Sequence, residues 1–226
     1  MIIDMRVYRY LPSGFADFLA SYAQYGQPVT ARHLGTTVGM FFSASGVANR
    51  TLQMFAYENS DHRDACRSAL RSDSQWLDFI REASQHIVEQ TNIILRPTDF
   101  SALKEYTQLA NPAAFASDFI EGMLFELRTY TAHPGRLPEA LELLRNEGCP
   151  LTHQYVERPV AYFTSETGVS NQVRMLWAYR NDGERDRRRD KMRADSQYRE
   201  LGARFNPLFA HQEGDLWLPV PHSPMR

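Results

Sequence analysis

The sequence states its central segment twice. Residues 56–76 recur as residues 178–198, and equivalent residues lie 122 positions apart, as Tyr57 and Tyr179 do. Between residues 39 and 76 the two copies align without a gap. An internal repeat of this length in a chain of 226 residues predicts two small domains with the same fold.

Each half shows one order of periodic segments: strand, helix, strand, strand, helix, strand. Alternating apolar and polar residues indicate a half-buried strand, whereas apolar residues spaced by three or four indicate a helix. In the first half this predicts strands at 2–10, 38–43, 51–57 and 92–95, and helices at 15–26, 28–34, 59–70 and 73–87. In the second half it predicts strands at 124–130, 160–165, 173–179 and 216–218, and helices at 137–148, 182–192 and 195–209.

The helices of one half can cover only one face of its four-stranded sheet. The other face must be buried, and the equivalent sheet is the obvious partner. We therefore expect an α+β fold in which two sheets pack face to face and close into a barrel with the helices outside. The expected domains are residues 1–98 and 121–226, joined by a connector at 99–120 with a helical turn near Phe115 and Phe119.

The alternation in the first strand of each half suggests a site. We expect the apolar residues to face the helices and the polar ones to face the space between the sheets, which makes an aromatic cavity with a carboxylate and an arginine from each half. The apolar set is Ile3, Met5, Val7, Phe125 and Leu127. The polar set is Asp4, Arg6, Tyr8, Tyr10, Glu126, Arg128 and Tyr130, joined by Gln53, Phe55, Tyr57, Met175, Trp177 and Tyr179 from the third strands.

These side chains suggest roles for a ligand in that cavity. Arg6 and Arg128 would orient an anionic group, and Asp4 or Glu126 would move a proton. The tyrosines, Gln53 and Trp177 would form the walls, with His153 near the mouth. The alternative is structural: carboxylate–arginine pairs that hold the two sheets in register around a filled core.

Composition and motifs exclude several functions. The net charge of −2 argues against a nucleic-acid partner, and no apolar run approaches a membrane span. The first residues do not resemble a signal peptide, so a cytoplasmic location is expected. The two cysteines and seven histidines lack metal-ligand spacing, and there is no GxGxxG, P-loop or GxSxG motif. We therefore expect neither a metal nor a cofactor.

Several motifs together resemble the NIPSNAP domain. They are residues 126–130 (Glu-Leu-Arg-Thr-Tyr), Pro134-Gly135, residues 164–168 (Thr-Ser-Glu-Thr-Gly), residues 176–179 (Leu-Trp-Ala-Tyr), Arg185 and Arg189, with looser matches in the first half. The resemblance implies tandem ferredoxin-like βαββαβ repeats that form a dimeric α/β-barrel within one chain. That superfamily includes cofactor-free monooxygenases, polyketide cyclases, lactone isomerases and haem enzymes, so the fold does not name a reaction.

The first half departs from this pattern, because Ala44 stands where the second half has Glu166 and Phe55 where it has Trp177. A working pocket is therefore expected in the second half. The leading hypothesis is a small-molecule-binding protein, or a cofactor-independent enzyme, that acts on a hydrophobic or aromatic metabolite between the sheets. The alternative is a non-catalytic structural or protein-interaction module. The expected partners are a small-molecule ligand and a second copy of the chain.

Overall fold

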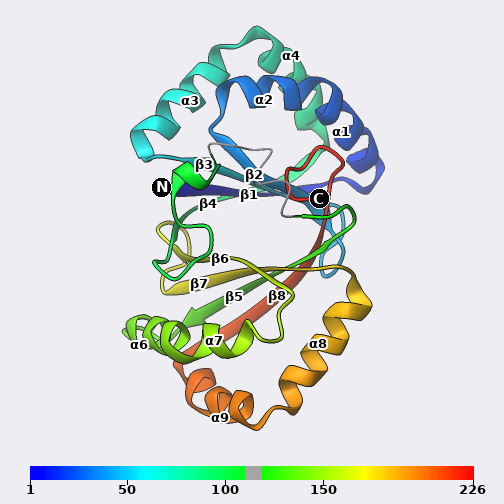
Figure 1. The fold of residues 1–226 in the computed structure, drawn as a ribbon. Helices are drawn as coiled ribbons and strands as arrows, with labels where there is room; N and C mark the ends of the chain where they lie inside the picture. The colour runs from blue at the N-terminus through cyan, green and yellow to red at the C-terminus, as the bar shows by residue number, and fades with distance from the viewer. Residues whose placement is uncertain (110–118) are drawn as a thin grey trace.

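The computed structural model describes residues 1–109 and 119–226 (Figure 1). The first half contains β1 (Ile2–Tyr10), η1 (Pro12–Gly14), α1 (Phe15–Ser21), η2 (Tyr22–Gly26), α2 (Gln27–His33), β2 (Thr36–Ser43), β3 (Arg50–Tyr57), α3 (Ser60–Ser72), α4 (Ser74–Ala83), η3 (Ser84–His86) and β4 (Ile87–Pro97). After η4 (Tyr106–Leu109), the second half contains β5 (Leu124–Ala132), α6 (Leu137–Leu143), η5 (Leu144–Gly148), α7 (Cys149–Thr152), β6 (Arg158–Ser165), β7 (Gln172–Tyr179), α8 (Asp182–Ala194), α9 (Ser196–Phe205), η6 (Asn206–Leu208) and β8 (Phe209–Pro219).

Helix starts repeat between the halves at the level of single hydrogen bonds. The Asn59 side chain accepts a hydrogen bond from the backbone N–H of His62 and so caps α3, and Asn181 caps α8 in the same way. Asp73 and Asp195 cap α4 and α9 by accepting from two backbone N–H groups each. These side chains satisfy N–H groups that the first helical turn leaves unpaired, which explains why the helices begin at equivalent residues.

The eight strands form one closed antiparallel barrel in the order β1-β3-β2-β8-β5-β7-β6-β4, with β4 paired to β1. The two sheets join where β2 pairs with β8 and where β4 pairs with β6. Helices α1–α4 cover the outer face of the first sheet, and α6–α9 cover the second on the opposite side (Figure 1). The predicted barrel of two repeated halves is therefore confirmed.

The predicted orientation of the strand faces is wrong. Ile3, Met5, Phe125 and Leu127 belong to one buried cluster inside the barrel, where the rings of Phe41 and Phe125 from opposite halves lie 4.8 Å apart. The polar residues of the same strands face the helices instead. A small closed barrel has no water or counter-charge inside, so apolar side chains fill it, whereas the helices bring arginines that can pair buried carboxylates.

Two predicted element boundaries are also wrong. The helix predicted to run to Ile87 ends at Ala83, and Ile87 begins β4. The predicted strand Leu216–Leu218 is only the end of β8, which begins at Phe209. Both strands are long because each pairs along its length with the first strand of its own half, and this pairing does not require alternating hydrophobicity. A 3₁₀ turn at Tyr106–Leu109 lies in the connector, whereas Phe115 falls outside the described residues.

The segment that follows the last strand of each half covers the sheet of the other half. After β4 the chain crosses to the second half, where Ser101 Oγ accepts a hydrogen bond from the backbone N–H of Tyr162 (2.9 Å). After β8 it crosses to the first half, where Ser223 Oγ accepts from the backbone N–H of Met40 (3.0 Å). The equivalent serines lie 122 positions apart, so the exchange of covering segments is part of the repeat.

Candidate functional site

A cluster of three arginines surrounds Glu126, whose side chain is 1% exposed. Arg128, two residues along β5 on the same face, donates from Nη1 to Oε1 (3.0 Å). Arg185 of α8 donates from Nε to Oε2 (3.1 Å) and from Nη2 to Oε1 (3.2 Å). Arg189, one helical turn later, places Nη1 3.6 Å from Oε1. Burial disfavours the charged carboxylate, but the charges of Arg189, Arg185 and Arg128 outweigh it and the pKa of Glu126 is lowered.

The first half repeats this cluster around Asp4. The Asp4 carboxylate accepts from Nε of Arg6 (3.1 Å), from Nε of Arg63 (2.8 Å) and from the amide of Asn92. Burial lowers the pKa of nearby Arg67, and the positive charge of Arg6 lowers it further. Each half thus holds three arginines around one buried carboxylate, and an exposed aspartate, Asp64 or Asp186, also pairs with Arg63 or Arg185.

The two clusters lie on the outer faces of the two sheets, with the apolar barrel interior between them. Asp4 and Glu126 therefore do not share an inter-sheet cavity, and that part of the prediction is corrected. Each predicted carboxylate–arginine pair does form, at spacing i, i+2 along its strand. A tyrosine completes each row, because Tyr8 accepts from Arg6 (3.1 Å) and Tyr130 from Arg128 (2.7 Å).

Other predicted wall residues separate into different environments. Tyr10 packs on Phe18 of α1 at 4.2 Å between ring centroids and shares a hydrogen bond with Thr51, so it belongs to the helix–sheet core. Gln53 is buried on the helix-facing side of β3, on the same parity as Tyr57. The hydroxyls of Tyr57 and Tyr179 are buried without a hydrogen-bond partner among the described residues.

His153 lies at the exposed edge of a polar network in the second half. Its Nε2 is 2.8 Å from the hydroxyl of Tyr162, which also accepts from Nε1 of Trp177 (3.2 Å). Burial lowers the pKa of His153, so its ring is neutral near pH 7. Burial also raises the pKa of neighbouring Cys149 to about 11, which keeps the thiol protonated. The sequence did not single out Tyr162, whose position lies within an uninterrupted apolar strand.

A pocket of about 80 Å³ opens between the second sheet and its helices. Its lining residues are Tyr130, Leu144, Gly148, Thr152, Met175, Trp177, Tyr198, Leu201, Gly202, Phe205 and Asn206. Typical drug-sized sites measure roughly 300–1,000 Å³, so this pocket admits a single ring or a short chain. Two predicted residues, Tyr130 and Trp177, form its walls.

The same place in the first half is filled by larger side chains. Gly202 corresponds to Ile80, Leu144 to Tyr22 and Leu201 to Phe79. Tyr22 and Phe79 pack edge to face at 6.0 Å in a buried cluster that Ile80 also contacts. The smaller residues of the second half therefore open this pocket.

The charged cluster is linked to this pocket through Trp177, which lines the pocket. The side chain of Arg189 is 9% exposed, and its guanidinium carbon lies 5.9 Å from the centroid of the Trp177 ring. Nε and Nη1 of Arg189 have no hydrogen-bond partner among the described residues. A buried donor without a partner is costly, so an additional acceptor beside Nε would stabilise this side chain, whereas Nη1 already faces Oε1 of Glu126 at 3.6 Å. Sequence reasoning noticed Arg189 but gave it no role, although its recurrence as Arg67 was a usable signal.

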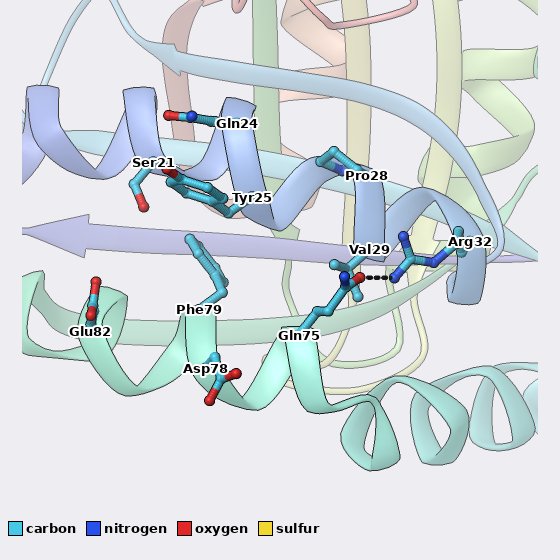
Figure 2. Close-up of a pocket in the computed structure, with 10 residues that line it drawn as sticks. All are labelled: Ser21, Gln24, Tyr25, Pro28, Val29, Arg32, Gln75, Asp78, Phe79 and Glu82. Carbon is cyan, nitrogen blue, oxygen red and sulfur yellow. Dashed lines mark hydrogen bonds between the residues drawn. The ribbon is translucent and has the colours of Figure 1, made fainter.

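A separate groove of about 470 Å³ runs between η2–α2 and α4 on the outside of the first half (Figure 2). Arg32 and Gln75 meet across it through a 2.7 Å hydrogen bond, and Tyr25 lies exposed at its edge. In the second half an ion pair between Arg204 and Glu147 spans the equivalent groove. None of the residues singled out from the sequence lines the groove of the first half.

Two further properties of the described residues bear on function. Within residues 1–109 and 119–226, no group of three or more metal-ligating side chains is close enough to hold an ion. No helix in these ranges is both long and apolar enough to span a bilayer.

Comparison with known proteins gives one family. The NIPSNAP family model matches residues 3–102 and 125–224. The chain is 24% identical over 191 residues to a protein NipSnap homolog of Dictyostelium discoideum, covering 84% of this chain and 74% of that protein. A NIPSNAP family protein of known structure from Agrobacterium tumefaciens is 29% identical and covers 47% of this chain and 94% of its own, with a TM-score of 0.46.

A structure with the same overall architecture comes from a more distant protein. The putative monooxygenase from Lactobacillus acidophilus matches 98% of this chain and 97% of its own with a TM-score of 0.63, at 10% identity. At that identity the likeness concerns the fold. The family model, in contrast, matches both halves of the repeat, and we conclude that the chain belongs to the NIPSNAP family.

Proposed function

We propose that the chain binds a small ring-containing anion in the pocket of the second half, with Arg189 as the group that pairs with the anion. The unpaired N–H groups of Arg189 carry this proposal. A carboxylate accepts charge-assisted hydrogen bonds from a guanidinium, and these bonds are stronger than neutral ones. The ring would occupy the space beside Trp177 and Tyr130, which line the pocket.

The arrangement gives the other charged residues supporting roles. Arg128 and Arg185 each donate to Glu126, and this fixes the carboxylate and the strand–helix spacing beneath the pocket. The lowered pKa of Glu126 keeps it ionised at neutral pH, which favours a positioning role over the proton transfer first considered for it. The proposed function is therefore binding of the anion. Any reaction would take place on the bound ring, without proton transfer by Glu126.

Benzoate tests this proposal because it has one ring and one carboxylate. Binding of 4-fluorobenzoate can be followed by ¹⁹F NMR line broadening, and by the rise in melting temperature at millimolar ligand. Gly202→Ile places the first-half residue in the pocket and should abolish binding. Arg189→Met should weaken binding at least about tenfold, which equals about 1.4 kcal/mol.

The repeat supplies a matched control. Arg67→Met removes the equivalent arginine from the first half and should leave benzoate binding unchanged, while circular dichroism confirms that each variant is folded. Equal binding by wild type, Gly202→Ile and Arg189→Met would overturn the proposal. Absence of saturable binding to the folded wild type would instead favour the structural alternative, which the packed barrel interior also suits.

A further inference from the structure

A further pocket of about 430 Å³ lies in the first half, between α2, β2 and the chain that follows β8. The residues that matter here are Gln27, Ala31, Met40, Phe55, Tyr106 and His222. Its volume is within the range of small-molecule sites. None of its lining residues is an aspartate, glutamate, lysine or arginine, so its walls offer only apolar side chains, uncharged polar groups and histidines to a ligand.

The equivalent space in the second half is filled by side chains. There the hydroxyl of Tyr162 lies within hydrogen-bond distance of His153 and Trp177, and the ring of Phe100 packs on Tyr162 with centroids 5.5 Å apart. At the equivalent positions of the repeat, the first half has smaller or different side chains: Met40 in place of Tyr162, Ala31 in place of His153, Phe55 in place of Trp177 and His222 in place of Phe100.

The backbone frame around the two spaces is the same. Met40 and Tyr162 each donate their backbone N–H to the serine that follows the crossing strand, at 3.0 and 2.9 Å. The difference between a filled and an open space therefore comes from side chains. Three of the four replacements remove a ring or part of one, and the fourth exchanges a phenyl ring for an imidazole.

Polar groups at the edges of the pocket can pair with an uncharged ligand. Thr36 donates to the hydroxyl of Tyr106 (3.3 Å), which leaves that hydroxyl free to donate. Burial lowers the pKa of His222, so the imidazole is neutral near pH 7 and offers one donor and one acceptor. Its Nε2 lies 3.3 Å from the sulfur of Met40, a weak acceptor, and its ring packs on Tyr22 with centroids 5.8 Å apart.

We propose that the pocket of the first half binds an uncharged planar ring compound that carries a hydroxyl or carbonyl group. The ligand would replace the rings that fill the second half, with Phe55 and Met40 against its face and His222 and Tyr106 at its polar group. This site is separate from the anion pocket, because the two have no lining residue in common.

The test uses 2-naphthol and its anionic counterpart 2-naphthoate, each titrated by isothermal calorimetry at pH 7. We expect 2-naphthol to bind with a Kd below about 1 mM, and Met40→Tyr with Phe55→Trp, which restore the second-half residues, to weaken it at least about tenfold. Gly202→Ile, which fills the other pocket, should leave 2-naphthol affinity unchanged.

A second variant keeps the test decisive if the double variant does not fold. His222→Phe introduces the second-half residue at a half-buried position outside the barrel and should also weaken 2-naphthol. Failure of 2-naphthol to saturate, or unchanged affinity in the folded variants, overturns the proposal. If 2-naphthoate also binds, and His222→Phe weakens it as much as it weakens 2-naphthol, the assignment of an uncharged ligand is overturned. Loss of benzoate binding alone would concern only the second-half site.

Discussion

Replacing Glu126 with glutamine should destabilise the protein strongly. The substitution keeps the shape of the side chain but removes the buried negative charge that Arg128, Arg185 and Arg189 share, at a position that is 1% exposed. Removing one partner of a buried ion pair typically costs about 3–5 kcal/mol, because the remaining charge stays buried. We expect this loss in the free energy of unfolding, measured by urea denaturation and circular dichroism at pH 7.

A surface pair provides the matched control. Glu166 accepts two hydrogen bonds from Arg96, at 2.9 and 3.2 Å, but the two side chains are 40% and 56% exposed. Exposed pairs contribute about 0–1 kcal/mol, so Glu166→Gln should cost little. If Glu126→Gln costs no more than Glu166→Gln, the buried cluster does not depend on its carboxylate and the reasoning is refuted.

The pH dependence of this difference has a definite sign. Because the folded state lowers the pKa of Glu126, its stabilising contribution is complete above the unfolded pKa of about 4.3 and is lost as pH falls through the lower folded pKa. The stability gap between wild type and Glu126→Gln should therefore stay constant from pH 7 to about 4.5 and then narrow. A gap that widens on acidification would show that the carboxylate is not stabilised by the arginines.

Four other perturbations test the packing. Tyr57→Phe removes a buried hydroxyl without a partner and should leave stability unchanged or raise it, whereas Tyr10→Phe loses a 2.9 Å hydrogen bond and should cost about 1 kcal/mol in urea denaturation. Cys66, which is half-buried, should react with a thiol reagent in the folded protein, and Cys149, with a pKa near 11, should react at neutral pH only after unfolding, as mass spectrometry can show. Gly35→Ala would place a Cβ 2.0 Å from a backbone carbonyl oxygen and should lower the melting temperature by several degrees.

The architecture was readable from the sequence because a repeat carries geometric information. One copy has a sheet with an uncovered face, and the second copy supplies the matching surface, so the barrel followed from residues 39–76 and their repeat. The first residues of β4 and β8 were not predicted as strand, and the reason is physical. Residues such as Glu89 and Gln90 are polar and exposed, and their strand conformation comes from pairing with β1.

The site was only partly readable. The rows containing Arg6 and Arg128 were identified, but alternation along a strand shows that two faces differ without showing which one is inside. The missing information lay in the helices. Arg63 and Arg67 recur as Arg185 and Arg189, and cations one helical turn apart in both copies require carboxylates on the facing sheet. The pocket of the second half depends on the small volume of Gly202. That volume is informative only once α9 is placed over the sheet.

The exchange of covering segments after β4 and β8 has a consequence for unfolding. Ser101 belongs by sequence to the first half but completes the second, and Ser223 does the reverse. If one half unfolded alone, the other half would lose a strand partner and the segment that covers its sheet. The chain should therefore melt in one cooperative transition, and a cut between the halves should yield fragments that need each other to fold.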